Sequence, residues 1–216
     1  MGSLPVIRQT AAGTEWTWQT VALVERAAAM ILLLLALPVL VICALVLCLL
    51  SRRSPLIAHR RVGWQGAPLW MLKLRTMWDA DTPHEGWIEH IDDDHGPALK
   101  SENDARVSSA FARFCRRHSV DELPQLWHVL SGEMSLVGPR PVTRYELDRY
   151  YGTHAEEILQ ARPGLAGLWQ VSGRNRLSYA ERCSLDLRLV RERNIPLYCT
   201  ILLRTLPEVL RGRNSW

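Results

Sequence analysis

The five cysteines show no paired spacing, and no segment of the chain repeats another. They lie at positions 43, 48, 115, 183 and 199, and the first two fall inside an apolar run. This pattern argues against a disulfide framework or a cysteine-based zinc site and is typical of a reducing compartment. The missing repeat argues against a solenoid. At 216 residues the chain can bury one substantial core, so we expect one domain beside any membrane segment.

Lysine is scarce, because 24 of the 26 basic residues are arginine. Lys73 therefore indicates a position where a compact ammonium group meets a phosphate or a carboxylate, although chance explains it equally well. The net charge of +4 is spread along the chain, and no motif interleaves basic with aromatic residues. These features argue against a nucleic-acid partner. Anionic lipid headgroups and phosphorylated substrates account better for the charge.

One long apolar run is present, and residues 27–50 contain no charged side chain. The run is long enough to reach across a bilayer, and it lacks the cleavage site of a secretory signal peptide. Pro38 lies in its middle and predicts either a kinked span or a re-entrant hairpin. The positive-inside tendency places the domain that follows in the cytoplasm, because the run is followed by Arg52, Arg53, Arg60 and Arg61. We therefore divide the chain into a cytosolic tail (1–25), a membrane-embedded helix (26–51) and a cytosolic domain (52–216).

The cytosolic part has the pattern of an α+β domain that is mainly helical. Residues 55–59 and 69–74 predict a short β-hairpin, with turn signals at Gly63 and Gly66. The acidic segment 79–104 is predicted to be a solvated loop. Apolar periodicity predicts helices at 107–118, 141–160, 179–193 and 197–210. The last is amphipathic, so it suits either the core or the membrane interface.

Asp121 and Glu122 form the most informative pair of residues. Adjacent carboxylates near a helix start can supply one group that attacks phosphorus and one that holds a divalent cation. The alternative is structural: Ser119 and Glu122 have the spacing of a capping box, with Asp121 complementing the helix dipole.

Four motifs occur in a fixed order and carry a resemblance. They are 73–77 (KLRTM), 121–126 (DELPQL), 134–141 (MSLVGPRP) and 162–175 (RPGLAGLWQVSGRN). Together they resemble the bacterial sugar transferase family, whose members are monotopic polyprenyl-phosphate phosphoglycosyl transferases. The resemblance runs from about Arg26 to the C-terminus. Within the family, the chain looks most like exopolysaccharide galactosyl- or glucosyl-1-phosphate transferases.

The resemblance implies transfer of a hexose 1-phosphate from a UDP-hexose to undecaprenyl phosphate, with release of UMP. It also implies a magnesium ion, a location at the bacterial inner membrane, and a catalytic domain facing the cytoplasm. Asp121 would be the nucleophile and Glu122 the metal ligand. The phosphates would be surrounded by Lys73, Arg116, Arg140 and Arg174, with Pro141 shaping the turn that presents Arg140. Weaker candidates for substrate binding are Arg75, Arg162 and Asp186.

Two other functions remain open at the level of sequence. A noncatalytic, membrane-anchored scaffold of an envelope assembly complex could retain the same domain, but the intact Asp121, Glu122 and Arg140 argue against it. A sugar-nucleotide hydrolase would use water in place of the lipid phosphate. The sequence is compatible with a homo-oligomer and does not require one.

Overall fold

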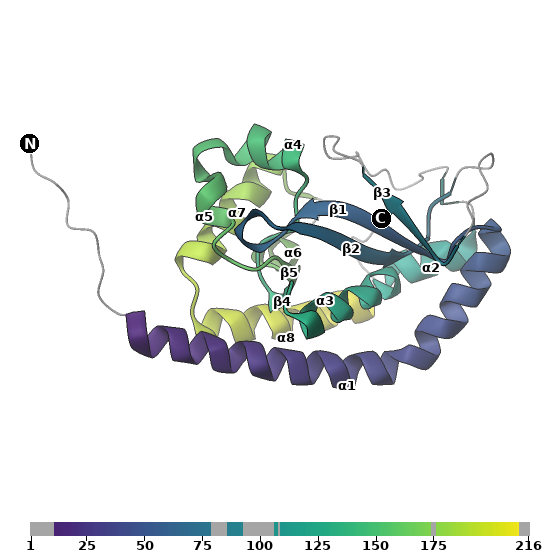
Figure 1. The fold of residues 1–216 in the computed structure, drawn as a ribbon, viewed down its shortest axis with the longest axis horizontal. Coiled ribbons are helices and arrows are strands. Elements are labelled where there is room, and N and C mark those ends of the chain that lie inside the picture. The colour runs from purple at the N-terminus through teal and green to yellow at the C-terminus, as the bar shows by residue number, and fades with distance from the viewer. Residues whose placement is uncertain (1–10, 79–85, 93–105, 108, 174–175, 212–216) are drawn as a thin grey trace, which may run out of the picture.

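The structure is a computed structural model that describes residues 11–78, 86–92, 106–107, 109–173 and 176–211. Figure 1 shows a small mixed domain resting on one long helix. The strands are β1 (Leu56–Val62), β2 (Pro68–Leu74), β3 (Ile88–Ile91), β4 (Ser135–Val137) and β5 (Gly164–Ala166). The α-helices are α1 (Ala11–Ser51), α2 (Ala110–Arg117), α3 (Leu126–Ser131), α4 (Arg144–Glu146), α5 (Ala155–Ile158), α6 (Leu168–Ser172), α7 (Tyr179–Arg191) and α8 (Ile195–Arg211). Short 3-10 or π turns are η1 (Trp64–Gly66), η2 (Val120–Gln125), η3 (Leu147–Tyr151) and η4 (Gly152–His154).

Helix α1 is continuous through Pro38 and is not divided into two helices there. Proline removes one backbone hydrogen bond and bends a helix without having to end it. Figure 1 shows α1 curving beneath the domain. Its segment Thr17–Ser51 is long and apolar enough to cross a membrane, and only 11% of the apolar window is buried. This exposure distinguishes α1 from the core helix of a water-soluble protein, while a re-entrant path stays a prediction.

The inner side of α1 nevertheless packs against the domain at two places. Ala29 joins a core cluster with Met71 of β2 and Val129 of α3. Further along, Leu47 joins a second cluster with Cys115 of α2. Each large aliphatic side chain buried in this way contributes about 1.5–3 kcal/mol. The two contacts hold the helix to the domain on both sides of its bend.

The predicted hairpin is confirmed and is longer than expected. Strands β1 and β2 pair antiparallel from Leu56↔Leu74 to Val62↔Pro68. The turn between them places Gln65 and Gly66 at φ values of 54° and 81°, a conformation that glycine adopts without strain. The prediction of a loop over 79–104 is wrong for Ile88–Ile91, because this segment forms β3 parallel to β1. Residues 79–85 and 93–104 lie outside the described part of the chain.

A second, two-stranded sheet pairs β4 with β5 in parallel, through Ser135↔Gly164 and Val137↔Ala166. Just past β4, the backbones of Gly138 and Gly164 approach so closely that a Cβ on either would overlap the other's backbone. Gly138 also donates its N–H to the carbonyl of Ala166 at 2.9 Å. The turn after β4 is therefore held tightly against the start of β5.

The helical predictions succeed in part. The helix expected at 179–193 is α7, and the one expected at 197–210 is α8. The single helix expected over 141–160 is instead the broken series α4, η3, η4 and α5. Gly152, at φ 48°, directly follows η3 and is the first residue of η4. The apolar spacing was therefore real, but the backbone does not continue as one helix through that glycine.

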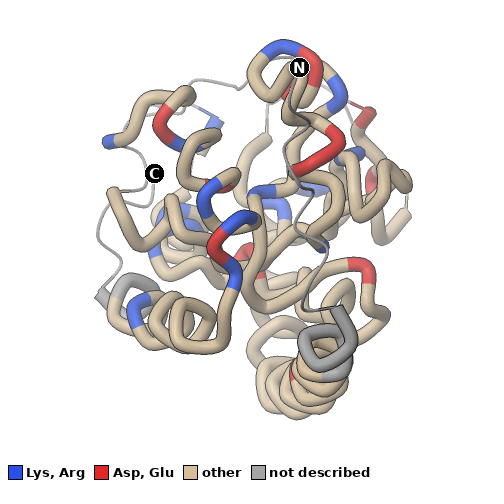
Figure 2. The backbone as a smooth tube through the Cα atoms, turned by 90° about the vertical axis from the view of Figure 1, so that its left-hand side faces the viewer, with Lys and Arg blue, Asp and Glu red and all other residues tan. Residues whose placement is uncertain are grey.

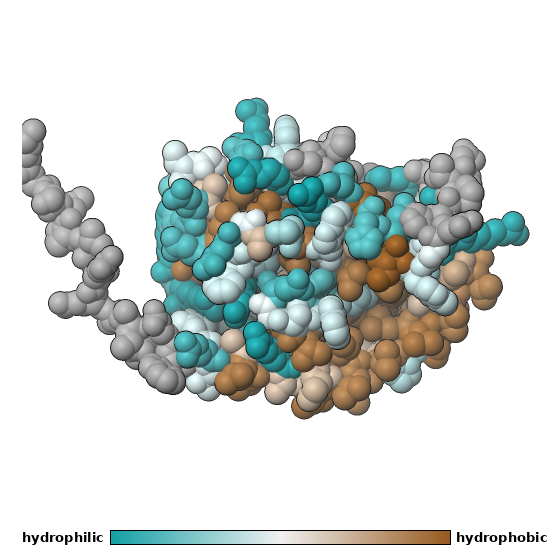
Figure 3. All heavy atoms as spheres, viewed as in Figure 1, coloured by the Kyte–Doolittle hydropathy of each residue, from teal (hydrophilic) through white to brown (hydrophobic). Residues whose placement is uncertain are grey.

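Charged and apolar residues separate over the surface. In Figure 2 the tube of α1 is almost free of charge, and most lysine, arginine and acidic positions lie on the rest of the domain. Figure 3 shows apolar side chains gathered along the lower side, where α1 runs. Exposed large hydrophobic residues of this helix include Leu34, Leu35 and Leu49. Such a surface suits contact with a membrane.

Candidate functional site

Asp121 and Glu122 lie in η2, a short turn between α2 and α3. The turn begins after Ser119, which has a left-handed backbone with φ 56° and makes no side-chain cap. The capping box proposed as the structural alternative is therefore absent. Asp121 is buried, with 8% of its surface exposed, whereas Glu122 is half-buried. The segment η2 packs against β2, α1 and α2, so the acidic pair lies where α1 meets the domain.

Lys73 of β2 contacts the acidic pair directly. Its Nζ donates to Oε1 of Glu122 at 3.0 Å, and 19% and 34% of the two side chains are exposed. The two residues are 49 positions apart, so the fold joins the first two motifs. A lysine suits this place because its ammonium is a compact point charge that approaches one carboxylate oxygen.

His128 of α3 fixes β2 beside Lys73, and the sequence analysis did not anticipate it. Its Nε2 accepts the backbone N–H of Leu72 at 3.1 Å, so its Nδ1 carries the hydrogen and donates to Glu133 at 2.8 Å. Burial raises the pKa of Glu133, but hydrogen bonds from His128 and Ser131 outweigh it, and the pKa lies below its usual value. The side chain supplies a hydrogen-bond partner at the edge of the sheet, where a strand partner is missing.

Two arginines near β2 differ in what they can still bind. Arg116 is half-buried, and its Nη1 reaches Thr76 Oγ1 at 3.5 Å, which brings α2 to the end of the 73–77 motif. Arg75 is only 4% exposed and donates from Nε to the Ser54 carbonyl at 2.7 Å. It also forms an ion pair with Glu89 of β3. Its guanidinium is thus engaged within the fold, so the geometry favours a structural role for Arg75.

The Gly138-Pro139-Arg140-Pro141 turn is held by Asp186 of α7. Oδ2 of Asp186 accepts the Arg140 backbone N–H at 3.3 Å and the Tyr151 hydroxyl at 3.0 Å. Asp186 is fully buried, and burial raises its pKa to about 7 in spite of these bonds and the nearby Arg140 charge. Pro141 is buried as well. Asp186 therefore acts on the turn that presents Arg140.

The side chain of Arg140 extends over an aromatic ring. Its Cζ lies 5.6 Å from the centroid of Trp169 in α6, and Arg182 of α7 approaches the same ring at 5.1 Å. Nε of Arg140 is buried without a hydrogen-bond partner among the described residues. Two guanidinium groups on one indole form a positively charged surface beside the turn, as an anionic ligand requires.

The remaining predicted residues lie elsewhere. Arg162, just before β5, has its Cζ 4.5 Å from the ring centroid of Trp64 and belongs to a separate cluster around Glu25. Arg174 lies outside the described residues. The structure thus brings together Lys73, Glu122 and Asp121 on adjoining elements, and it joins Arg140, Pro141 and Asp186 in a second group.

The donor set around Asp121 and Glu122 is suited to magnesium. In the part of the chain that the structure describes, no three side chains of His, Cys, Asp or Glu converge as a complete metal site. Magnesium does not need such a cage, because it is commonly held by one or two carboxylates, several waters and the phosphates of a substrate. Adjacent carboxylates, one of them half-buried, fit that manner of binding.

Comparisons with known proteins agree with the motif order. The family model described as "Bacterial sugar transferase" matches residues 16–212. The exopolysaccharide production protein ExoY of Rhizobium meliloti is 41% identical over 162 residues, covering 73% of this chain and 71% of the relative. A UDP-glucose:undecaprenyl-phosphate glucose-1-phosphate transferase of Caulobacter vibrioides is 38% identical over 199 residues, covering 88% and 69%.

Some relatives are much longer. The UDP-galactose-lipid carrier transferase of Erwinia amylovora is 39% identical over 171 residues, which is 76% of this chain and 35% of the relative. The shared region therefore corresponds to about a third of that protein. The family model itself spans all four motifs described above.

Proposed function

Because the chain belongs to the bacterial sugar transferase family, we propose that it transfers a hexose 1-phosphate from a UDP-hexose to undecaprenyl phosphate at the membrane surface. Its relatives are named for transfer of glucose 1-phosphate or galactose to such lipid carriers and for exopolysaccharide production. The observation that carries the proposal is the Lys73–Glu122 ion pair beside Asp121, at the junction of η2, β2 and α1. The two carboxylates and the Lys73 ammonium therefore lie next to α1, the helix that would contact the lipid.

Asp121 acts as the nucleophile in this proposal. One carboxylate oxygen attacks the phosphorus that bears the sugar, and the bond from that phosphorus to the bridging oxygen of UMP breaks. The product is an aspartyl phosphosugar, and UMP leaves with the bridging oxygen as a negatively charged phosphate oxygen. An oxygen of the lipid phosphate then attacks the same phosphorus, which releases the Asp121 carboxylate and forms the lipid diphosphate sugar.

Basic side chains from both groups would bind the phosphates. Lys73 holds Glu122 in place and adds a positive charge, and Arg116 of α2 and Arg140 of the turn after β4 would supply guanidinium groups. Glu122 would hold magnesium, which when bound supplies charge neutralisation at the diphosphate. Asp186 and Tyr151 position Arg140 through its backbone.

The shape of the molecule explains why the acceptor is a lipid. α1 carries an exposed apolar surface over most of its length, so we infer that it lies in the inner membrane and holds the domain at its cytoplasmic side. A polyprenyl phosphate keeps its charged group at the headgroup level and its chain among the acyl tails. A site packed against α1 meets that phosphate at the correct depth.

The decisive experiment uses purified protein in detergent with magnesium and UDP-hexoses, with and without undecaprenyl phosphate. We expect sustained UMP release only when the lipid is present, and about one UMP per chain together with an added sugar-phosphate mass on the protein when the lipid is omitted. Asp121→Asn should lose the adduct and lower turnover by about 10⁴-fold or more. Wild-type turnover by this variant would remove Asp121 as the nucleophile.

The same assay separates the alternatives. UMP release that continues without the lipid acceptor, together with free sugar phosphate, would identify a hydrolase. Failure with every UDP-hexose and with other nucleotide sugars would support a noncatalytic scaffold. Glu122→Gln provides a matched test of the metal role, since the concentration of magnesium required for half-maximal rate should rise.

A further inference from the structure

A second cluster of charge lies away from the acidic pair, and three arginines form it. Arg26 comes from α1, Arg162 from the segment before β5, and Arg193 from the turn between α7 and α8. The pKa of Arg162 is lowered by burial and then by Arg26, and that of Arg193 is lowered by burial with a contribution from Arg162. Arg162 thus lies close enough to both Arg26 and Arg193 for its charge to interact with theirs.

The cluster contains a single neutralising carboxylate, Glu25, among the residues that the structure describes around it. Glu25 is 5% exposed. Its Oε1 already accepts from Ser135 Oγ at 2.5 Å, from the Leu136 backbone N–H at 2.7 Å and from the Tyr198 hydroxyl at 2.6 Å. Three guanidinium groups against one carboxylate leave an excess of positive charge, and that excess favours a bound anion.

Two hydrogen-bond donors of the cluster are buried and have no partner. Nε of Arg26 and Nε of Arg162 make no hydrogen bond within the described part of the chain. A buried donor without a partner costs about 1–3 kcal/mol, so its presence in a folded protein calls for an explanation. A ligand oxygen that accepts from these groups would supply one.

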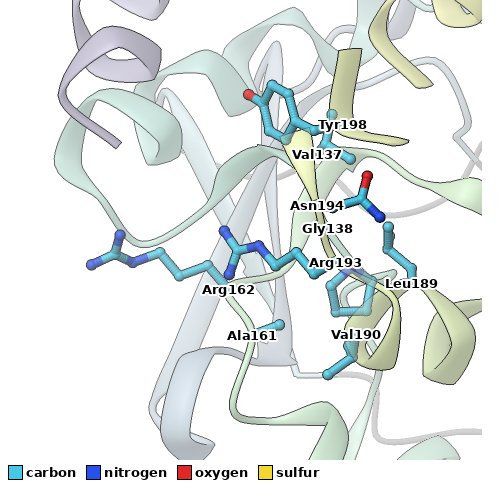
Figure 4. Close-up of a pocket in the computed structure, with 10 residues that line it drawn as sticks. Val137, Gly138, Ala161, Arg162, Leu189, Val190, Arg193, Asn194 and Tyr198 are labelled. Carbon is cyan, nitrogen blue, oxygen red and sulfur yellow. The ribbon is translucent and has the colours of Figure 1, made fainter. Parts of the chain in front are cut away.

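Two members of the cluster, Arg162 and Arg193, line a small pocket. Figure 4 shows Arg162 and Arg193 extending in the same direction, with the Tyr198 hydroxyl turned toward that side. Val137, Leu189 and Val190 give the pocket an apolar lining. Arg193 is further positioned by Trp18, because its Cζ lies 3.7 Å from the ring centroid. The guanidinium groups are therefore held in place before any ligand arrives.

The position along α1 indicates which anion is available. Arg26 directly precedes the uncharged run 27–50, so it lies at the depth of the lipid headgroups when that run is in the membrane. Trp18 and Tyr198 are in contact at 6.3 Å between ring centroids, and such aromatic side chains concentrate at the membrane interface. At this depth the abundant anion is a phosphate group attached to a lipid.

We propose that Arg26, Arg162 and Arg193 form a binding site for the phosphate group of an anionic lipid, separate from Asp121 and Glu122. Arginine suits this ligand because its planar group donates two parallel hydrogen bonds to phosphate oxygens. The apolar pocket lining accepts the first carbons of the lipid. Arg162 accordingly binds a lipid phosphate and not the diphosphate of the sugar donor. This inference goes beyond the proposed transfer reaction and does not depend on it.

Native mass spectrometry of the full chain in detergent tests the site without any nucleotide sugar. The probes are dihexanoyl phosphatidylglycerol, farnesyl phosphate, dihexanoyl phosphatidylcholine and inorganic phosphate. We expect one anionic lipid to remain bound per chain, and Arg193→Gln and Arg26→Gln to weaken its binding at least tenfold. Tighter binding of the glycerol lipid or of farnesyl phosphate identifies the source as a membrane phospholipid or an isoprenoid phosphate, and either supports the site.

Arg204→Gln is the matched control, because it removes the same charge from an exposed position on α8. It should retain binding within twofold. Equal losses in Arg204→Gln and Arg193→Gln would show general attraction of lipid to a basic surface and overturn the proposal. Equal affinity for phosphatidylcholine or for inorganic phosphate would also overturn it. Should Arg193→Gln fail to fold, Arg193→Lys keeps the charge but not the paired donors, and it should still weaken binding.

Discussion

At the scale of single residues, burial separates arginines that stabilise the domain from those that can meet a ligand. Arg75 and Arg116 lie near the same strand, yet Arg75 is enclosed by Ser54 and Glu89 while Arg116 stays half-buried. The sequence does not distinguish them, because Arg75 lies within the 73–77 motif and Arg116 lies shortly before the 121–126 motif. Only the tertiary environment shows which guanidinium group is already engaged.

Replacing Arg75 by Gln should therefore lower the free energy of unfolding and leave the donor's KM unchanged. The loss should be about 3 kcal/mol, since one member of a largely buried ion pair is removed. Arg60→Gln is the control, because its pair with Asp92 is exposed at 54% and 53% and should contribute less than about 1 kcal/mol. Denaturant unfolding in detergent measures both. A raised KM with unchanged stability would restore Arg75 as a substrate ligand.

Asp186 should make stability depend on pH. Its folded pKa of about 7 exceeds the ordinary value of 3.8, so between these values the folded state holds the proton more firmly than the unfolded chain. The stabilisation of the folded state by protonated Asp186 is complete below about pH 4 and is lost as the pH rises through 7. From pH 5 to 8, stability of the wild type should fall by about 2 to 3 kcal/mol relative to Asp186→Asn.

The measurement is the difference in unfolding free energy between the two proteins at each pH. Asp148→Asn serves as the control, because Asp148 is an exposed partner of Arg144. The expected trend would be refuted by a constant difference, or by one that shrinks toward pH 8.

At the scale of elements, local signals predicted what depends on local sequence. The β1–β2 hairpin follows from two apolar segments around Gly63 and Gly66, and it formed as expected. Strand β3 was missed because Ile88–Ile91 is four residues long and lies in an acidic segment, and its pairing with β1 spans about thirty residues of chain. The resemblance predicted that Lys73 and Glu122 serve one site, but their ion pair required the fold.

The helices show the same limit. Apolar residues at a spacing of about 3.6 correctly predicted α7 and α8. Over 141–160 the same spacing gave no sign of the interruption at Gly152. Capping boxes at Thr143–Glu146 and Ser178–Glu181 were not anticipated, whereas the one considered at Ser119 does not form. A cap depends on the backbone angle of its first residue, which the residue type alone does not determine.

Pro38 gives a prediction for α1 as an element. In an isolated helix, replacing proline by leucine would be favourable by about 3 kcal/mol. Here the bend lets both Ala29 and Leu47 reach the domain, so Pro38→Leu should reduce stability by straightening the helix. Hydrogen exchange of β2 and α2 in nanodiscs should become faster.

Pro207→Leu in α8 is the matched control, since Pro207 lies inside another helix and supports no comparable bend. It should leave exchange in β2 and α2 unchanged. Slower exchange in Pro38→Leu would show that the bend opposes the packing of α1.

At the scale of the whole molecule, α8 carries exposed apolar side chains as α1 does. Leu203 and Leu206 of α8 are 69% and 62% exposed, which is costly in water and favourable in the membrane interface. The double substitution Leu203→Glu and Leu206→Glu should weaken the contact between α8 and the membrane interface. Under the proposed function, KM for the lipid acceptor should rise at least tenfold while KM for the nucleotide sugar stays constant, because each buried leucine contributes about 1.5–3 kcal/mol.

Steady-state kinetics in nanodiscs measures both constants. The control is Thr200→Glu with Arg204→Glu, which adds negative charge to α8 at positions that are already polar and exposed. Comparable rises in the lipid KM for both pairs would attribute the effect to charge repulsion and not to lost apolar contact.

The contact between Gly138 and Gly164 also has a consequence for how such enzymes can be recombined. The turn that carries Arg140 and the segment that begins at Arg162 touch backbone to backbone, with no side chain between them to absorb a misfit. A chimera that takes one segment from a homologue and keeps the other would combine two surfaces shaped for different partners. Grafts that change donor preference should therefore exchange residues 134–141 and 162–173 together, as a single cassette.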